Sequence, residues 1–499
     1  MNAFSRRGAC PALSAPMQTG DGLMVRLNPV TGGLAPNLLI RLGESALRHG
    51  NGIMEVTARG SLQIRGLSAE SARMLAAEVD ALGIEVRTGV PVETGPLAGI
   101  DPQEVADPRP LAERLRAAIE EAGLTARLGP KVSVLVDGGG QLTMDAVAAD
   151  VRLKAVRAGA GVLWAVSVAG DDQSAKPLAM VEEEASRYVT VAALRMVAEK
   201  GRQAHTRDLT ERQLNSLASW HSGAPLSVLP DISPSGGEIG SFADGSLSAA
   251  NPHVFTSAIG ESRGGKAISP LEGEMSGRTE RGAMERQPAG SPIDTFSLAG
   301  GTALGIALPF GSMPAQNLVE LATKAAELGS TEIRLAPGRA LLVLGLSPSA
   351  SPSLQSTAAT LGFVTSPADP RTRIAACPGT PACASGNIAT RAIAETIAAE
   401  SPELLDTSLT LHISGCAKGC AHPGAAMLTL VGDENGAGLV VDGTAKALPA
   451  GYRPGYDAAR GVAAIAAAVR GERHQGETAA ACLTRLGAAR IAELYRRNQ

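Results

Sequence analysis

Apolar residues recur along the chain in two matching series that lie 279 residues apart. The residues identical in both series are Leu42, Ala46, Gly50, Leu62, Gly66, Leu67, Ser68, Leu82 and Gly83 in the first copy, and Leu321, Ala325, Gly329, Leu341, Gly345, Leu346, Ser347, Leu361 and Gly362 in the second. Each copy predicts the order strand, helix, strand, strand, helix. Asn37–His49 has helical spacing and is followed by Gly50 as a C-cap, and the second helix runs to Leu82 and Gly83. The pattern therefore predicts a duplicated α/β arrangement.

Residues 56–65 alternate strictly between apolar and polar side chains and predict one strand of the first copy. Its apolar face is Val56, Ala58, Leu62 and Ile64, and its polar face is Thr57, Arg59, Ser61, Gln63 and Arg65. The second copy has Ala336, Gly338, Ala340, Leu342 and Leu344 on the same face. An ordinary solvated face would not need this asymmetry, so it favours a single anion-binding site in the first half.

Two further basic stretches are candidates for the same site. Lys131 begins an apolar strand that ends in a flexible turn, Asp137 to Gly140. Asp150, Arg152 and Lys154 lie on one face of another predicted strand. Exposed basic residues at strand ends explain both stretches equally well, and the sequence leaves this open. Several cations together would suit a substrate with several carboxylates.

The composition argues against a nucleic-acid-binding, a membrane-spanning or a secreted protein. The 499 residues carry 45 basic and 49 acidic side chains and only twelve aromatic ones, which argues against a nucleic-acid partner. No apolar run approaches the roughly 18 to 20 residues of a membrane span, and Met1 to Met17 lacks the apolar stretch of a signal peptide. We therefore expect a cytoplasmic protein. No complete dinucleotide or phosphate-loop fingerprint occurs, so electrons for any redox reaction would come from outside.

Four of the six cysteines fall within 44 residues, with the spacing C-x5-C, a gap of 32 residues, and C-x3-C. They are Cys377, Cys383, Cys416 and Cys420, in two segments rich in Gly and Pro. Four thiolates in such loops suit a 4Fe-4S cluster; a tetrahedral zinc, which usually takes tighter C-x2-C pairs, and four unligated thiols are the alternatives. Cys482 lies in an alanine-rich helical pattern and is expected to be a core residue, and Cys10 to be incidental.

These residues resemble the sirohaem sulfite and nitrite reductase superfamily and, within it, the precorrin-3B synthase family of aerobic cobalamin biosynthesis. The resemblance covers nearly the whole chain. It rests on the cysteine spacing, the repeat and five segments: Arg7 to Pro11, Gly20 to Leu23, Thr57 to Arg59, Val136 to Gly140, and Ser414 to Pro423. Sulfite reductases carry Pro-Arg-Lys-x-Lys where this chain has Gly129-Pro-Lys-Val-Ser133, so the second lysine is a serine and sulfite reduction becomes doubtful.

The resemblance implies an α+β fold with two ferredoxin-like half-domains and two larger α/β lobes. We expect an N-terminal tail at 1–15, half-domain 1 at 16–92, lobe 1 at 93–225, a linker at 226–295, half-domain 2 at 296–368, and a 4Fe-4S-binding lobe 2 at 369–499. Within the linker, 261–292 holds ten charged residues, six glycines and four large apolar side chains, which predicts a disordered insertion.

The resemblance also implies an oxygen-dependent monooxygenase that hydroxylates C20 of precorrin-3A and closes a γ-lactone from the ring A acetate. The expected carboxylate contacts are Arg59, Arg65, Lys131, Arg152 and Lys154, while Thr57 and Gln63 are expected to hydrogen-bond the macrocycle or the oxygen species. Cys377, Cys383, Cys416 and Cys420 would hold the cluster. An external donor, either an NADH-linked reductase or a ferredoxin or flavodoxin, would supply electrons.

The family is described as also using a mononuclear non-haem iron. No His pairs with a carboxylate in an H-x-D/E motif, so the sequence does not reveal its ligands. His422, two residues after Cys420, is a possible iron ligand or hydrogen-bond donor, and His412 is expected to be a satisfied structural residue. Two alternatives remain open: a sulfite or nitrite reductase with bound sirohaem, and a non-catalytic iron-sulfur electron carrier, against which the single cationic face argues.

Overall fold

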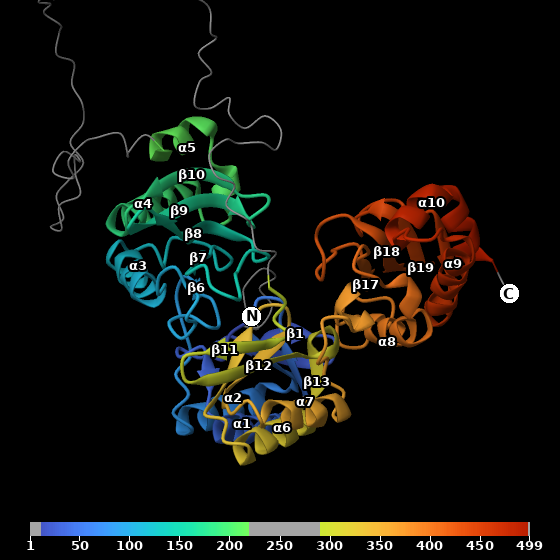
Figure 1. The fold of residues 1–499 in the computed structure, drawn as a ribbon, viewed down its shortest axis with the longest axis horizontal. Coiled ribbons are helices and arrows are strands. Elements are labelled where there is room, and N and C mark those ends of the chain that lie inside the picture. Colours follow the sequence, from blue (N-terminus) through green and yellow to red (C-terminus); the bar gives the residue numbers. More distant parts are fainter. Residues whose placement is uncertain (1–10, 219–289, 498–499) are drawn as a thin grey trace, which may run out of the picture. The chain divides into compact units, whose positions relative to one another are not determined.

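The structure, a computed structural model, describes residues 11–218 and 290–497 (Figure 1). Most of the expected insertion at 261–292, together with Cys10, His221 and His253, lies outside these residues. The described chain forms four five-stranded sheets with helices packed against them, which confirms the predicted duplicated α+β architecture. No helix of the described ranges has both the length and the apolar content that a membrane crossing requires.

The two half-domains each contain one sheet and two helices. Half-domain 1 has the strand order β1-β2-β5-β4-β13, formed by Met17–Thr19, Gly22–Leu27, Leu62–Leu67, Ile53–Val56 and Ser312–Pro314, with helices α1 (Pro36–His49) and α2 (Ala69–Ala81). Half-domain 2 has the order β11-β12-β15-β14-β3, formed by Thr295–Leu298, Gly301–Ala307, Ala340–Leu346, Glu332–Ala336 and Gly33–Leu34, with α6 (Ala315–Glu327) and α7 (Ser351–Thr360). Each half thus lends one short strand to the sheet of the other.

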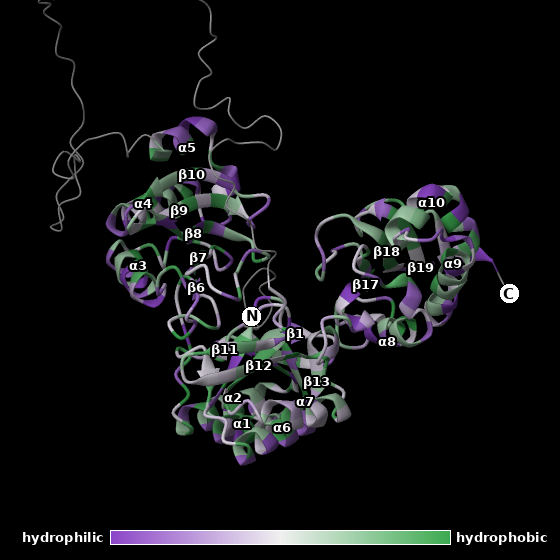
Figure 2. Cartoon of the chain, in the orientation of Figure 1, coloured by the Kyte–Doolittle hydropathy of each residue, from purple (hydrophilic) through white to green (hydrophobic). Residues whose placement is uncertain are grey.

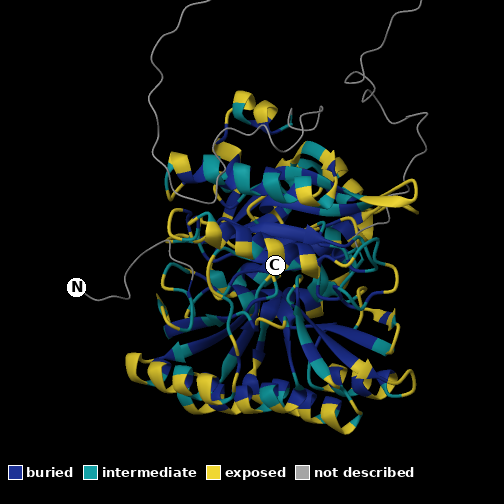
Figure 3. Ribbon diagram, turned by 90° about the vertical axis from the view of Figure 1, so that its left-hand side faces the viewer, coloured by how far each residue is buried: buried dark blue, intermediate teal, exposed yellow. Residues whose placement is uncertain are grey.

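The half-domains share one apolar core, because α1 packs directly on α6. Leu42 of α1 and its repeat partner Leu321 of α6 are both fully buried. The helices approach closely at Gly43, where an added Cβ would lie 2.6 Å from the Val319 side chain. In Figure 2 these helices contain both hydrophilic and hydrophobic residues, and Figure 3 shows exposed residues along the helices and buried strands above them. The predicted helix at 37–49 is confirmed, including Gly50 as its C-cap.

Residues 56–65 form a hairpin and not the single strand that their alternation predicted. β4 ends at Val56 and β5 begins at Leu62. The backbone turns between them, where Gly60 donates to the Thr57 carbonyl at 2.9 Å and the Thr57 hydroxyl accepts from the Ser61 amide at 3.0 Å. Gly60 has a φ of +78°, a conformation that favours glycine and ends the strand. Arg59 therefore lies on the turn, whereas Gln63 and Arg65 lie on β5.

The two larger lobes share a sheet topology. Lobe 1 contains β6 (Val92–Thr94), β7 (Val134–Asp137), β8 (Ala149–Ala158), β9 (Gly161–Gly170) and β10 (Lys176–Val181), with α3 (Arg109–Glu121), α4 (Glu183–Lys200) and α5 (Glu211–Ala218). Lobe 2 contains β16 (Ile374–Ala376), β17 (Leu411–Ser414), β18 (Ala426–Asp433), β19 (Gly436–Gly443) and β20 (Gly451–Arg453), with α8 (Thr390–Glu400), α9 (Ala458–Glu472) and α10 (Ala479–Arg496). The first three strands of each sheet are parallel, and the last two pairings are antiparallel.

The shared topology places two loops at equivalent positions in each lobe. The loops that follow β6 and β7 in lobe 1 are the topological counterparts of those that follow β16 and β17 in lobe 2. Strands predicted after Lys131 and at Asp150–Lys154 are confirmed as β7 and β8, and Cys482 is a buried residue of α10 as expected. The predicted domain boundaries stay predictions; Val92, the last residue of predicted half-domain 1, is the first residue of β6.

Candidate functional site

The four clustered cysteines lie in two loops of lobe 2 that begin at adjacent strand ends. Cys377 directly follows β16 and Cys383 lies in the same loop, whereas Cys416 and Cys420 follow β17. β16 and β17 are parallel, with Ala376 opposite Ile413, so both loops leave the same edge of the sheet. A separation of 32 residues in the sequence therefore becomes proximity in space.

Backbone contacts hold the two cysteine loops together. The Gly415 amide donates to the Cys377 sulfur at 3.1 Å, and the Asn387 amide donates to the Gly415 carbonyl at 2.8 Å. A Cβ at position 415 would lie 3.1 Å from the Gly386 Cα and 3.2 Å from the Gly379 Cα, closer than most Cβ contacts. The glycines around these cysteines thus allow close approach of two backbones, as the sequence pattern suggested.

The sulfur atoms share one electrostatic environment. Burial raises the pKa of the Cys420 thiol, and the charges of the Cys377, Cys416 and Cys383 thiolates raise it further. Cys377 is buried, whereas Cys420 keeps an exposed part, so the burial that raises the pKa of its thiol is only partial. Thiolates that repel one another in this way are stabilised by a bound cationic centre, which deprotonates its thiol ligands.

The donor set fits a 4Fe-4S cluster better than a single ion. Among the described residues, no three His, Cys, Asp or Glu side chains lie close enough together to share one metal ion. Zinc gathers its four thiolates at about 2.3 Å from one centre, whereas a 4Fe-4S cluster is larger and takes one thiolate on each iron. Cys377, Cys383, Cys416 and Cys420 are therefore the residues that would hold such a cluster.

The described residues do not assemble a ligand set for a mononuclear iron. The Nε2 atom of His422 lies 3.2 Å from the Ala425 carbonyl oxygen, and the His422 ring lies edge-on to that of His412 with 5.7 Å between centroids. His412 lies on β17 as expected and is fully buried, but neither of its ring nitrogens has a hydrogen-bond partner within the described chain. Burial, with a smaller contribution from His422, lowers the pKa of His412 to about 4, so its ring is neutral at pH 7.

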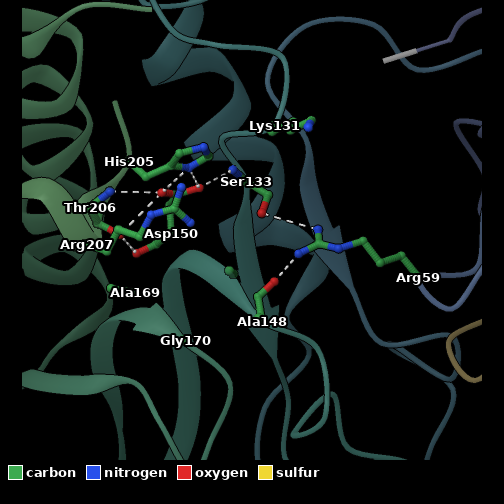
Figure 4. Close-up of a pocket in the computed structure, with 11 residues that line it drawn as sticks. Arg59, Lys131, Ser133, Ala148, Asp150, Ala169, Gly170, His205, Thr206 and Arg207 are labelled. Atoms are coloured by element: carbon green, nitrogen blue, oxygen red, sulfur yellow. Dashed lines mark hydrogen bonds and ion pairs between the residues drawn. The ribbon is translucent and has the colours of Figure 1, made fainter. Parts of the chain in front are cut away.

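A second candidate site is a cavity of about 200 Å³ beside the β4–β5 turn and lobe 1 (Figure 4). Its cationic lining residues are Arg59, Lys131 and Arg207, and the lining also includes Asp150 and His205. Arg59 donates to the Ser133 hydroxyl at 3.3 Å and to the Ala148 carbonyl, and it lies 3.6 Å from Glu93. Its side chain remains 40% exposed, so the guanidinium can still reach a ligand.

Asp150 orients the far wall of this cavity. Its buried carboxylate accepts from the Ser133 amide at 3.1 Å, from the Thr206 amide at 3.0 Å, and lies 3.0 Å from Nδ1 of His205. Figure 4 shows Thr206, His205 and Arg207 gathered around Asp150. No pattern in the sequence predicts His205 or Arg207 as site residues. They follow α4 without a repeat or spacing that marks them, and only the fold brings them to Lys131.

Several other predicted site residues lie away from the cavity lining. Arg152 is buried and donates to the carbonyls of Met144 and Val147, and Lys154 binds Asp145 at 2.7 Å. The Thr57 hydroxyl stabilises the β4–β5 turn.

Gln63 and Arg65 belong to a buried network on β5. The Gln63 side chain accepts from Arg26 at 2.7 Å and donates to Glu55 at 2.7 Å, while Arg65 pairs with Asp21 and Glu55. The structure thus brings Arg59 and Lys131 together but places Arg65, Arg152 and Lys154 in contacts of their own. Their predicted roles toward a substrate stay predictions.

Several known proteins are similar to this chain in sequence or in fold. The family described as the nitrite/sulfite reductase ferredoxin-like half domain matches residues 15–82. A ferredoxin–nitrite reductase of Synechococcus elongatus is 23% identical over 464 residues, which cover 90% of this chain and 83% of that protein. The structure of the NirA protein of Mycobacterium tuberculosis superposes with a TM-score of 0.65 at 18% identity, covering 95% of this chain and 85% of that one. This last likeness concerns the fold alone.

A nearer relative is named precorrin-3B synthase and comes from a Sinorhizobium species. It is 38% identical over 493 residues, and the match covers 99% of this chain and 95% of the relative. The likeness therefore includes both half-domains and both lobes. On this full-length match, the chain belongs to the precorrin-3B synthase family, an enzyme family within the sulfite and nitrite reductase superfamily.

Proposed function

We propose that this chain is an oxygen-dependent monooxygenase that converts precorrin-3A to precorrin-3B, hydroxylating C20 and closing a γ-lactone with the ring A acetate. The observation that supports the proposal most is the 38% identity, over nearly the whole of both chains, to a protein named precorrin-3B synthase. The site adds chemical support, because a cavity with three cationic side chains suits a substrate that carries several carboxylates.

Arg59 and Lys131 are the residues that we propose to bind substrate carboxylates, and Arg207 joins them. All three line one cavity, and the Arg59 guanidinium keeps a solvent-accessible part. Ser133 replaces the second lysine of the sulfite reductase stretch and lies against both Arg59 and Asp150. A hydroxyl at this position leaves fewer charges to bind a small oxyanion such as sulfite.

In the same proposal, Cys377, Cys383, Cys416 and Cys420 hold a 4Fe-4S cluster, which when bound supplies one-electron transfer. Electrons reach it from an external NADH-linked reductase or from a ferredoxin or flavodoxin. The proposal places the protein in the cytoplasm, where thiols stay reduced. A mononuclear non-haem iron stays a prediction without assigned ligands, since the described residues assemble no such set.

The test is anaerobic purification followed by optical and EPR spectroscopy with and without precorrin-3A. We expect a 4Fe-4S signal and product formation that needs oxygen, with label from heavy-isotope oxygen appearing in the product. Arg59→Ala should weaken substrate binding while cluster content stays at the wild-type value. Arg157→Ala, an exposed arginine of β8 outside the cavity lining, is the matched control and should bind substrate normally.

A sirohaem-dependent nitrite or sulfite reductase is the second candidate, favoured by the 23% identity to a ferredoxin–nitrite reductase. It predicts the absorption band of bound sirohaem and turnover of nitrite or sulfite, and either result would overturn the monooxygenase. Cluster signals without any oxygen-dependent turnover of precorrin-3A would instead support an electron carrier.

A further inference from the structure

Arg65 connects half-domain 1 to the loop that carries Cys383. Its side chain is only 4% exposed, and Nη2 donates to the carbonyl of Ala382, the residue before Cys383. The Gly20 amide also donates to this carbonyl, at 3.2 Å. A Cβ at position 20 would lie 2.3 Å from the Pro381 carbonyl oxygen, so the β1–β2 turn packs tightly on the loop.

Two carboxylates fix the direction of the Arg65 guanidinium. Asp21 receives two hydrogen bonds, from Nε at 3.1 Å and from Nη2 at 2.9 Å, in the bidentate arrangement that suits arginine. Glu55 on the neighbouring strand β4 accepts from Nη1 at 3.3 Å. Each nitrogen of the guanidinium therefore has a protein partner, and the charge is occupied within the chain.

Glu55 extends the network to the far end of the same loop. Its other oxygen lies 2.6 Å from Nη2 of Arg391, in the first turn of α8, directly after the Cys377–Cys383 loop. Two carboxylates, Asp21 and Glu55, thus face two guanidiniums, Arg65 and Arg391, and the nearby Arg339 adds further positive charge beside Arg391. The loop is held at Ala382 by Arg65 and at α8 by Glu55.

We propose that Arg65 is a positioning residue for the iron-sulfur centre: it fixes the Cys383 loop, and its positive charge offsets the Asp21 and Glu55 carboxylates, which keeps the reduction potential of the cluster from falling. This inference rests on the cluster assignment of the proposed function. Without Arg65, the Ala382 carbonyl loses a donor and the two carboxylates lose their shared cation. The added negative potential would favour the oxidised, less negative cluster.

The experiment compares Arg65→Met and Arg65→Lys with wild type after anaerobic reconstitution. The readouts are iron and sulfide bound per chain and the midpoint potential from an EPR redox titration. We expect Arg65→Met to bind less cluster, to lose it faster in air, and to show a more negative potential, with Arg65→Lys intermediate. Arg152→Met removes an equally buried arginine of lobe 1 and is the matched control, expected to keep wild-type cluster content and potential.

Asp21→Asn keeps Arg65 but removes one negative charge, so it should shift the potential in the positive direction. This opposite sign separates an electrostatic role from simple damage to the fold, and it serves as the test if Arg65→Met does not fold. Wild-type potential and cluster content in both Arg65→Met and Asp21→Asn would overturn the inference. Cys383→Ala tests the underlying assignment separately, because alanine has no donor atom: an unchanged four-iron signal there would overturn the cluster ligands themselves.

Discussion

The centre of β5 carries Gln63 and Arg65, whereas the same positions of β15 in the other half-domain carry Leu342 and Leu344. All four residues are buried, so exposure to solvent does not explain the difference. The neighbouring strands differ accordingly. Gln63 lies between Arg26 and Glu55 in the first sheet, and Leu342 lies between Gly305 and Arg334 in the second.

The segments that pack on each sheet face explain whether that face carries polar or apolar side chains. Over the second sheet, the chain itself passes so close to Gly305 that an added Cβ would lie 1.9 Å from the Pro292 carbonyl oxygen. Leu97 and Leu142, from the two counterpart loops of lobe 1, pack with Leu342 in one apolar cluster. No room remains there for a side chain such as Arg26, and no buried polar partner is needed.

The first face instead meets a loop of lobe 2 that presents a backbone carbonyl, at Ala382, and the helix α8 after it, which presents a cation at Arg391. Buried polar groups need partners, so this face must carry charges that complement them. The cationic residues of the first half therefore have two separate roles. Arg65 supports the cysteine loop, and Arg59, on the turn beyond, lines the cavity.

Placing a charge on the apolar face of β15 should have the largest effect on the stability of the protein. Leu342→Glu would bury a carboxylate among apolar side chains, and we expect it to lower the free energy of unfolding by about 4 kcal/mol or more. Urea-induced unfolding measures this loss. Leu342→Met is the size-matched control and should cost less than about 1.5 kcal/mol. A well-tolerated Leu342→Glu would mean that this face admits water.

Removing one charge from the first face should have a slightly smaller effect. Glu55→Gln leaves Arg65 and Arg391 with one carboxylate fewer in a buried site, and breaking a buried pair typically costs about 3–5 kcal/mol. We expect a loss of about 3 kcal/mol, since the one oxygen of Gln can still accept from Gln63 and Arg65, whereas its NH2 group cannot accept from Arg391. The measurement is again urea-induced unfolding. If Glu55→Gln were as stable as wild type, the ion-pair account of this face would be wrong.

Arg59 should behave in the opposite way, with a large effect on binding and a small one on stability. A hydrogen bond to a charged group contributes about 1.5–3 kcal/mol, so Arg59→Ala should weaken precorrin-3A binding about 10- to 100-fold. Because the side chain is 40% exposed, the free energy of unfolding should change by less than about 1 kcal/mol. Equilibrium titration measures the change in substrate affinity, and thermal unfolding measures the change in stability. Unchanged affinity would remove Arg59 from the proposed substrate site.

The smallest expected effect is a pH dependence of stability that arises from Asp21 in the first half. Burial raises the pKa of Asp21, but hydrogen bonds from Arg65 and Thr19 and the charge of Arg65 outweigh it, so the pKa lies below its ordinary 3.8. A carboxyl whose pKa is lower in the folded state stabilises the fold above the unfolded pKa, and this contribution is lost as the pH falls through the folded value.

The stability difference between wild type and Asp21→Asn should therefore be constant above about pH 5 and shrink as the pH falls below about 4. Urea unfolding across this range measures it. The residue equivalent to Asp21 in the second half is Gly300, so no matching carboxyl exists there. A difference that persisted unchanged at low pH would show that Asp21 does not act through its charge.

The sequence predicted the features that local patterns encode. Helical periodicity located α1, the repeat located its twin α6, and the cysteine spacing located two loops that the fold does bring together. The hairpin at 56–65 was predicted as one strand because both of its arms continue the same alternation, and only the conformation of Gly60 interrupts it.

Features that depend on distant segments could not be predicted. The exchanged strands β3 and β13 are two and three residues long, too short for a periodic pattern to register. The contacts of Arg65 could not be predicted either, because its partners Asp21, Glu55 and Ala382 come from three other segments. His205 and Arg207 reach the cavity only through the position of the 3-10 turn that follows α4.

The exchange of β3 and β13 makes the two halves of the duplication mutually dependent. A half-domain produced alone would keep a four-stranded sheet with a bare edge at β4 or β14, and its own donated strand would have no partner. It would also expose the apolar surface that joins α1 to α6. Unpaired edges and apolar surfaces of this kind promote self-association. The protein therefore resembles an obligate dimer whose two subunits are joined in one chain. Half-domains produced separately should fold only when they are mixed.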